Sequence, residues 1–327
     1  MKSLSIALAL STAYARAQDL KQTIVGCVDL ECPASSAAPA DDNCTVSDKS
    51  FSYVGLTRIP TENKDLEGKI SWTKGFNVIN TAEDGRTFDS VFYFGTTPDL
   101  DLGDTGACAV FLHGIENELS FDKVNVNVET AQGTCSDAMG PDCVNALVER
   151  AKKLFNNFEG DTPTSEEACS KLKDDLQKNI DDACASITKE PWTNVSVSAL
   201  SGEAAYKPLS GDKNSSSTCW PVLPKENQLT LAGEYQTQGS DKIDEIQKAL
   251  YSVTPILTVF FPTGKQSIVS EVDASLSCLK VVGPSRASAD AMDDGSGDPD
   301  NGVSKTMPSH SALFGLSVGV MAAALLL

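Results

Sequence analysis

Residues 143–187 read CVNALVERAKKLFNNFEGDTPTSEEACSKLKDDLQKNIDDACASI, and this stretch decides the predicted fold. Apolar residues in its first half recur at steps of three and four, which places them on one face of a helix. They are Val144, Leu147, Val148, Ala151, Leu154, Phe155 and Phe158. A second helix is expected after Thr164, because Thr164 and Glu167 fit a capping box. Its apolar stripe comprises Cys169, Leu172, Leu176, Ile180, Ala183, Cys184 and Ile187.

A turn at residues 160–163, Gly-Asp-Thr-Pro, separates the two predicted helices. If the helices form an antiparallel hairpin about this turn, Cys143 near the start of the first faces Cys184 near the end of the second. The sequence therefore predicts a disulfide between Cys143 and Cys184.

Strand-like segments flank the helices on both sides. They are rich in β-branched and aromatic residues and are separated by Gly, Asp and Pro. Those before the helices are Phe51–Ile59, Lys69–Ile79, Thr87–Phe94, Ala107–His113 and Leu119–Val128. Those after them are Val195–Leu200, Gln228–Gln236, Ile256–Phe261 and Ser267–Val282, with a short helix over Ile243–Tyr251. This order predicts an α+β fold, a disulfide-stabilised antiparallel β-sheet with a central helical hairpin.

The N-terminus has the pattern of a secretory signal peptide over residues 1–17. Lys2 is followed by an apolar stretch, and Ala15-Arg16-Ala17 has the small-x-small form of a cleavage site. We expect the mature chain to begin at Gln18, to enter the secretory pathway and to fold as one extracellular domain over residues 18–283.

The C-terminus has the pattern of a glycosylphosphatidylinositol (GPI) anchor signal. Residues 312–327 carry no charge, yet as a helix they would span only about 24 Å of the roughly 30 Å hydrocarbon core. Residues 284–311 form an acidic Gly/Ser/Asp-rich spacer, which we expect to be disordered. Small residue, spacer and apolar tail together favour lipid attachment at Asn301, with Ser296 and Gly295 as alternatives, over a single membrane span.

The cysteines indicate disulfides in an oxidising compartment. The ten are Cys27, Cys32, Cys44, Cys108, Cys135, Cys143, Cys169, Cys184, Cys219 and Cys278. No C-x-x-C pair occurs, and His113 is the only histidine of the expected mature chain, residues 18–301, so the sequence predicts neither a zinc site nor another cofactor.

Surface chemistry gives two further expectations. Three N-glycosylation sequons begin at Asn43, Asn194 and Asn214, which places these residues on the surface if they are modified. The formal net charge of −19 disfavours binding to nucleic acid and suits a soluble extracellular domain.

Motifs for hydrolytic chemistry are weak. Gly315-Leu-Ser317-Val-Gly319 matches a nucleophile elbow but lies in the tail expected to be removed. Asp104-Thr105-Gly106 matches one aspartic-protease motif, whereas that chemistry needs two, so a turn in an acidic run is the better interpretation. With Asp99 and Asp101, the run is also only a loose calcium pattern.

Two other features bear on catalysis. His113 ends an apolar strand and is interpreted as a structural residue. Glu116 and Glu118 could form the carboxylate pair of a glycosidase, although alternating acids are also typical of an exposed strand edge.

A resemblance to a group of known proteins rests on two segments, together with the predicted signal, spacer and tail. The segments are Thr105-Gly-Ala-Cys-Ala-Val-Phe111 and Gln132-Gly-Thr-Cys-Ser-Asp-Ala138. The chain resembles uncharacterised secreted, GPI-anchored, cysteine-rich surface proteins of filamentous ascomycete fungi. The resemblance implies a location at the plasma membrane or cell wall and no particular activity.

The leading functional hypothesis is therefore a GPI-anchored surface or wall glycoprotein with a structural, adhesive or recognition role and no catalysis. Its expected partners are a wall polysaccharide or a surface protein, with the membrane reached through the lipid. The alternatives are a wall-polysaccharide hydrolase that uses paired carboxylates and a secreted effector or toxin-like protein.

Overall fold

A computed structural model describes most of the region between residues 24 and 283. The described residues are 24–27, 30, 44–51, 53–80, 85–113, 119–121, 128–158, 163–179, 181–188, 190–209 and 220–283. All of them belong to one compact unit that spans residues 1–292.

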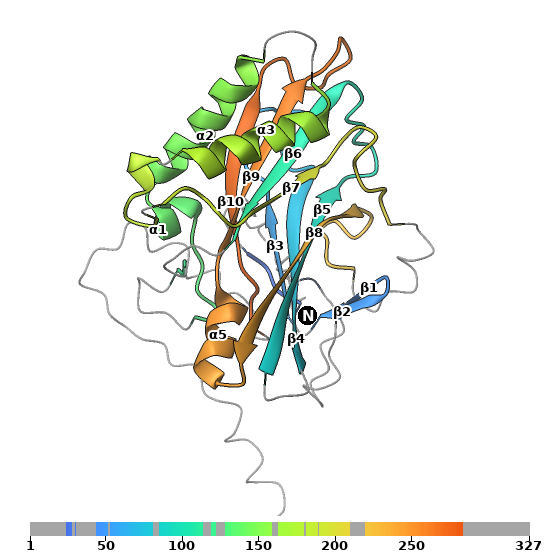
Figure 1. Ribbon diagram of the computed structural model, residues 1–327. Coiled ribbons are helices and arrows are strands. Elements are labelled where there is room, and N and C mark those ends of the chain that lie inside the picture. Colours follow the sequence, from blue (N-terminus) through green and yellow to red (C-terminus); the bar gives the residue numbers. More distant parts are fainter. Residues whose placement is uncertain are drawn as a thin grey trace, which may run out of the picture. The chain divides into compact units, whose positions relative to one another are not determined.

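Two four-stranded antiparallel sheets form the centre of this unit (Figure 1). The first contains β3 (Tyr53–Arg58), β4 (Ile70–Asn80), β5 (Gly85–Thr96) and β8 (Gln228–Ser240), in that order. The second has the order β10 (Asp273–Leu279), β9 (Thr254–Pro262), β6 (Thr105–Leu112) and β7 (Val195–Ala199). A separate pair joins β1 (Cys44–Val46) to β2 (Lys49–Phe51).

The inner faces of the two sheets pack together through aromatic side chains. The Phe111 ring lies 5.5 Å from Trp72 and 4.8 Å from Phe92, measured between ring centroids. The Trp72 indole Nε1 donates to the Thr258 hydroxyl at 3.0 Å, which satisfies its one buried polar group. β4, β5, β6 and β9 thus build a sandwich core from residues far apart in the chain.

Helices cover the second sheet on its outer face (Figure 1). α2 (Pro141–Asn156) packs against β9 and β10, and α3 (Ser165–Lys178) packs against β6 and β7. The short α1 (Cys135–Met139) precedes α2, and a 3-10 turn, η2 (Asp182–Cys184), follows α3. α5 (Ile243–Tyr251) lies elsewhere, against β8 and β5.

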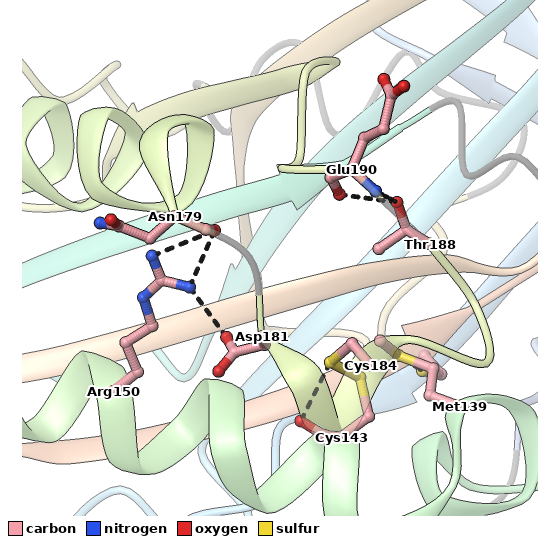
Figure 2. The surroundings of a disulfide bond; sticks show 9 residues. Met139, Cys143, Arg150, Asn179, Asp181, Cys184, Thr188 and Glu190 are labelled. Atoms are coloured by element: carbon pink, nitrogen blue, oxygen red, sulfur yellow. Dashed lines mark hydrogen bonds and ion pairs between the residues drawn. A yellow bond between two sulfur atoms is a disulfide. The ribbon is translucent and has the colours of Figure 1, made fainter.

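Two disulfides attach this helical layer to the second sheet, and a third lies within the layer. Cys108 in β6 pairs with Cys169 in α3, Cys135 in α1 with Cys278 in β10, and Cys143 in α2 with Cys184 in η2. The last is the pair expected from the sequence, and its sulfur atoms lie 1.98 Å apart (Figure 2). Cys44 is also disulfide-bonded and Cys27 is half-buried, while Cys32 and Cys219 lie outside the described residues.

Arg150 in α2 joins α3 and the segment after it (Figure 2). Its Nε donates to the Asp175 carboxylate at 2.5 Å, and its Nη1 donates to the Asp181 carboxylate at 2.8 Å. Nη2 donates to the Asp175 carbonyl at 2.7 Å. These bonds and the Cys143–Cys184 disulfide hold α2 against the chain that leaves α3.

The structure confirms a mixed α/β fold with antiparallel sheets and corrects several details. The single predicted sheet is two sheets. The second helix ends at Lys178 instead of continuing to Ile187, because Asn179 is extended (φ −123°, ψ 138°) and donates its side-chain amide back to Asp175. That α2 and α3 form one central hairpin stays a prediction.

Three sequence assignments also change. α1 was not expected, although Thr134 and Asp137 form a capping box at its start. Residues 119–121 and 128 of the predicted strand Leu119–Val128 are not in a strand, and residues 122–127 lie outside the described residues. Of the segment Ser267–Val282, only Asp273–Leu279 is a strand.

Candidate functional site

A cavity of about 340 Å³ opens at the end of the sandwich that α5 covers. β4, β5, β8 and α5 contribute to its wall, together with residues at the end of β6 and the start of β9. Phe76, Phe88 and Leu112 give it apolar surface, and Lys74, His113 and Tyr235 give it polar groups. α5 is held here by Leu250 and Tyr251, which are its buried residues.

Lys74 occupies an inward-facing position of β4. Ile70, Trp72 and Phe76 share its alternation and are all buried, so the strand itself places the lysine inside the sandwich. The residue is only 1% exposed. Its position is a signal that sequence reasoning missed, since a lysine stands where the pattern requires an apolar residue.

The groups in contact with the Lys74 amine are neutral. Nζ donates to the Ser252 carbonyl at 3.3 Å and to the Thr254 hydroxyl at 3.2 Å. The ring centroids of Phe76 and Phe92 lie 5.9 and 5.8 Å from Nζ. No carboxylate of the described residues pairs with it. Burial, and next the charge of Lys280, lower the pKa of Lys74 to about 7.

His113 forms the adjacent part of the wall. Its ring stacks on Tyr235 with centroids 3.8 Å apart and an interplanar angle of 5°. Its Nε2 shares a hydrogen bond of 2.9 Å with the Ser196 hydroxyl. Burial, and next the charge of Lys74, lower the pKa of His113 to about 3. The imidazole is therefore neutral at physiological pH.

The sequon at Asn194 adjoins this wall. Asn194 is exposed, and its Nδ2 donates to the Tyr235 hydroxyl at 2.6 Å. Ser196, the third residue of the same sequon, is the hydrogen-bond partner of His113. The segment before and within β7 thus fixes both members of the stacked pair.

A second cavity of about 400 Å³ lies along a neighbouring side of α5 and contains Lys280. The Lys280 amine donates to the carbonyls of Val128 and Glu129 at 2.5 and 3.3 Å. Its Nζ lies 5.4 Å from the centroid of the Tyr251 ring. Burial lowers the pKa of Lys280 to about 8, and the Glu129 carboxylate acts in the opposite direction. Lys280 differs from Lys74 because a nearby carboxylate, that of Glu129, favours its charged form.

The acidic run predicted as a turn is held by one hydrogen bond within the run and by two contacts to distant parts of the chain. Asp104 accepts a hydrogen bond from the Gln266 backbone at 3.0 Å, and Asp101 accepts one from Gly103 at 3.0 Å. Asp99 pairs with Lys69 at 3.5 Å. Within the described ranges, no group of three or more metal-ligating side chains converges.

The other sequence-predicted positions are not described. Glu116 and Glu118, Asn43, the sequon at Asn214, Asn301 and residues 315–319 all lie outside the described residues. In the portion of the chain that is described, no helix has both the length and the apolar character needed to cross a membrane.

Comparison with known proteins gives no match to a protein family, a curated protein or a solved structure. Functional inference therefore depends on the cavity beside Lys74.

Proposed function

We propose that the protein is a GPI-anchored cell-surface glycoprotein whose extracellular domain recognises a small ligand in the cavity beside Lys74. The signal-like N-terminus and the uncharged tail support the location, and the disulfides are compatible with it. In this proposal the role is recognition without catalysis, as the sequence leads us to expect.

The chemistry of the cavity wall carries the proposal. Ligand sites are concave and mainly apolar, with a few convergent polar groups, and residues with strongly shifted pKa values gather in them. Phe76 and Phe88 supply the apolar surface, and Lys74 and His113 have lowered pKa values. A small organic molecule with an apolar body and one polar group matches this wall.

The acid that borders the cavity is already engaged. Glu245 accepts a hydrogen bond from the Ser240 backbone at 3.0 Å and lies 3.7 Å from the Lys242 amine. Since His113 stays neutral and Glu245 has local partners, the described wall lacks a free carboxylate pair for glycoside hydrolysis. This favours recognition over hydrolysis at this site.

We also propose that α2 and α3 form one hairpin that braces the second sheet. The Cys143–Cys184 disulfide and the Arg150 bonds to Asp175 and Asp181 support this arrangement. A rigid outer layer would leave the α5 end of the sandwich as the part that adapts to a ligand.

Filling the cavity tests the proposed function. Ala249 lies on α5 and lines the cavity, so Ala249→Phe should occupy the space that a ligand needs. Saturation-transfer difference NMR with 3-phenylpropanol should show contact with the unaltered protein and at least about tenfold weaker binding to A249F. Ile243→Phe is the matched control, because Ile243 lies on the same helix and is 70% exposed. Equal binding to all three proteins, or to none, would contradict the proposal.

The partner classes expected from the sequence can be tested with the same preparation. Incubation with insoluble wall polysaccharides should deplete the protein from solution without releasing sugar if the role is wall recognition. Sugar release that disappears in Glu116→Gln or Glu118→Gln would favour the hydrolase instead.

A further inference from the structure

We infer that Lys74 captures its ligand covalently, through condensation of its amine with the carbonyl group of an aldehyde that enters the cavity. This inference rests on the proposed function, because it requires that the cavity admits a small organic molecule. It adds the chemical class of the ligand and the residue that bonds to it.

The hydrogen bonds of Lys74 suit a neutral amine. A neutral amine has two N–H groups and one lone pair, whereas an ammonium group has three N–H groups and no lone pair. Two acceptors, the Ser252 carbonyl and the Thr254 hydroxyl, lie within hydrogen-bond distance of Nζ. They satisfy both N–H groups of the neutral form and leave its lone pair available.

The charged groups around the cavity also favour the neutral amine. His113 and Tyr235 line the same cavity as Lys74, α5 contributes Glu245 and Lys248, and Lys280 acts from the neighbouring cavity. The Glu245 carboxylate interacts with Ser240 and Lys242. The positive charge of Lys280 disfavours protonation of Lys74. With a pKa of about 7, roughly half of the Lys74 side chains carry a free amine at pH 7. Amine nucleophiles in proteins are activated in this way, by desolvation and a nearby cation.

The proposed step is balanced without any further reactant. The nitrogen lone pair attacks the aldehyde carbon, the carbonyl π electrons move to oxygen, and a proton passes from nitrogen to that oxygen. Loss of the hydroxyl group with the remaining amine proton releases one water and leaves a C=N bond between ligand and Lys74. Because water is the only product released, the reaction is reversible, as capture and release of a ligand requires.

Lys280 provides an internal comparison. It is also buried, but its amine donates to two main-chain carbonyls and the Glu129 carboxylate favours its charged form. Its pKa of about 8 leaves a smaller fraction of free amine at pH 7. A comparison of the two lysines therefore tests whether burial alone makes an amine reactive or whether the particular surroundings of Lys74 are needed.

Reductive trapping tests the inference. The protein purified from cells that express the full chain is incubated at pH 7 with 3-phenylpropanal and cyanoborohydride, which reduces an imine to a stable secondary amine. Peptide mapping should find Lys74 labelled at least about tenfold more than exposed lysines, whose amines are almost fully protonated at this pH. The labelling rate of Lys74 should reach half of its maximum near pH 7, and 3-phenylpropanol should slow it.

Mapping of the unaltered protein identifies the labelled lysine even if a variant does not fold. Lys74→Met should remove the dominant label, and Lys280→Met should retain it. Label spread evenly over exposed lysines, or concentrated on Lys280, would overturn the inference. If 3-phenylpropanol binds in the cavity and Lys74 is not labelled, the covalent step is wrong and the proposed function is unaffected. If neither compound binds, both are wrong.

Discussion

At the scale of single residues, Lys74 lowers the stability of the fold in a pH-dependent way. Its pKa is about 7 in the folded protein and has an ordinary value of 10.5. Between these values the unfolded chain binds the proton and the folded chain does not, so the free energy of unfolding rises with pH. Below pH 7 the folded protein must bury a charged amine, and the full free-energy cost of burying this charge then lowers the stability of the fold.

Replacing Lys74 with Met should therefore stabilise the protein, and more so at low pH. We expect the difference in unfolding free energy between K74M and the unaltered protein to be larger at pH 6 than at pH 9, by about 2–3 kcal/mol. Urea unfolding at both pH values measures it. Lys178→Met is the control, since Lys178 has an exposed side chain paired only with Asp174. A stability difference for K74M that does not change with pH would contradict the assignment.

Residue-level patterns drew attention to His113 but did not predict this site. His113 is the one histidine of the predicted mature chain, and its place at the end of an apolar strand suggests a structural role; in the structure it is buried in a stacked pair. Its partner Tyr235 could not be found from the sequence, because 122 positions separate them and the contact depends on how β6 and β8 face one another. Lys74 could have been found from its phase in the alternation of β4.

At the scale of the elements, Arg150 should be the main polar link between α2 and α3. It is mostly buried, with a side chain 15% exposed, and it bonds two carboxylates and a carbonyl. Hydrogen bonds to charged groups contribute about 1.5–3 kcal/mol, and loss of Arg150 also leaves Asp175 and Asp181 without their partner. We expect Arg150→Met to lower the free energy of unfolding by about 2–3 kcal/mol.

The exposed Lys178–Asp174 pair on α3 is the matched comparison. Exposed ion pairs contribute about 0–1 kcal/mol, so Lys178→Ala should change stability by less than about 1 kcal/mol. Chemical denaturation of both variants with the disulfides intact measures the difference. Equal effects would mean that Arg150 does not link the two helices.

Local periodicity predicted most elements but not their pairing. α5 has the predicted bounds, Ile243–Tyr251, and α2 follows its predicted stripe. The sequence could not show that β6 pairs with β9 or β5 with β8, because these partners are more than 130 residues apart. For this reason the sequence predicted one sheet where the structure has two. The spacing of strands along a chain does not specify which sheet a strand joins.

At the scale of the whole molecule, the disulfides fix which parts must move together. Cys108–Cys169, Cys135–Cys278 and Cys143–Cys184 all involve α1, α2, α3 or η2, so the helical layer is attached to β6 and β10. None of these three bridges reaches α5. Reduction should therefore affect the helical layer more than the cavity.

The predicted membrane attachment also belongs to the scale of the whole molecule, and it depends on residues 284–327, which lie outside the described residues. As a helix, residues 312–327 would span only about 24 Å of the roughly 30 Å hydrocarbon core, and the sequence therefore predicts replacement of this segment by a lipid at Asn301. Phosphatidylinositol-specific phospholipase C should then release the protein from intact cells. Deletion of residues 312–327 should give a protein that is secreted without membrane attachment, because the signal for lipid transfer is absent.

If the full chain resists the phospholipase and leaves the membrane only in detergent, the tail is a span and the predicted anchor is wrong. The cavity and its Lys74 chemistry would be unaffected, since they belong to the domain before residue 284.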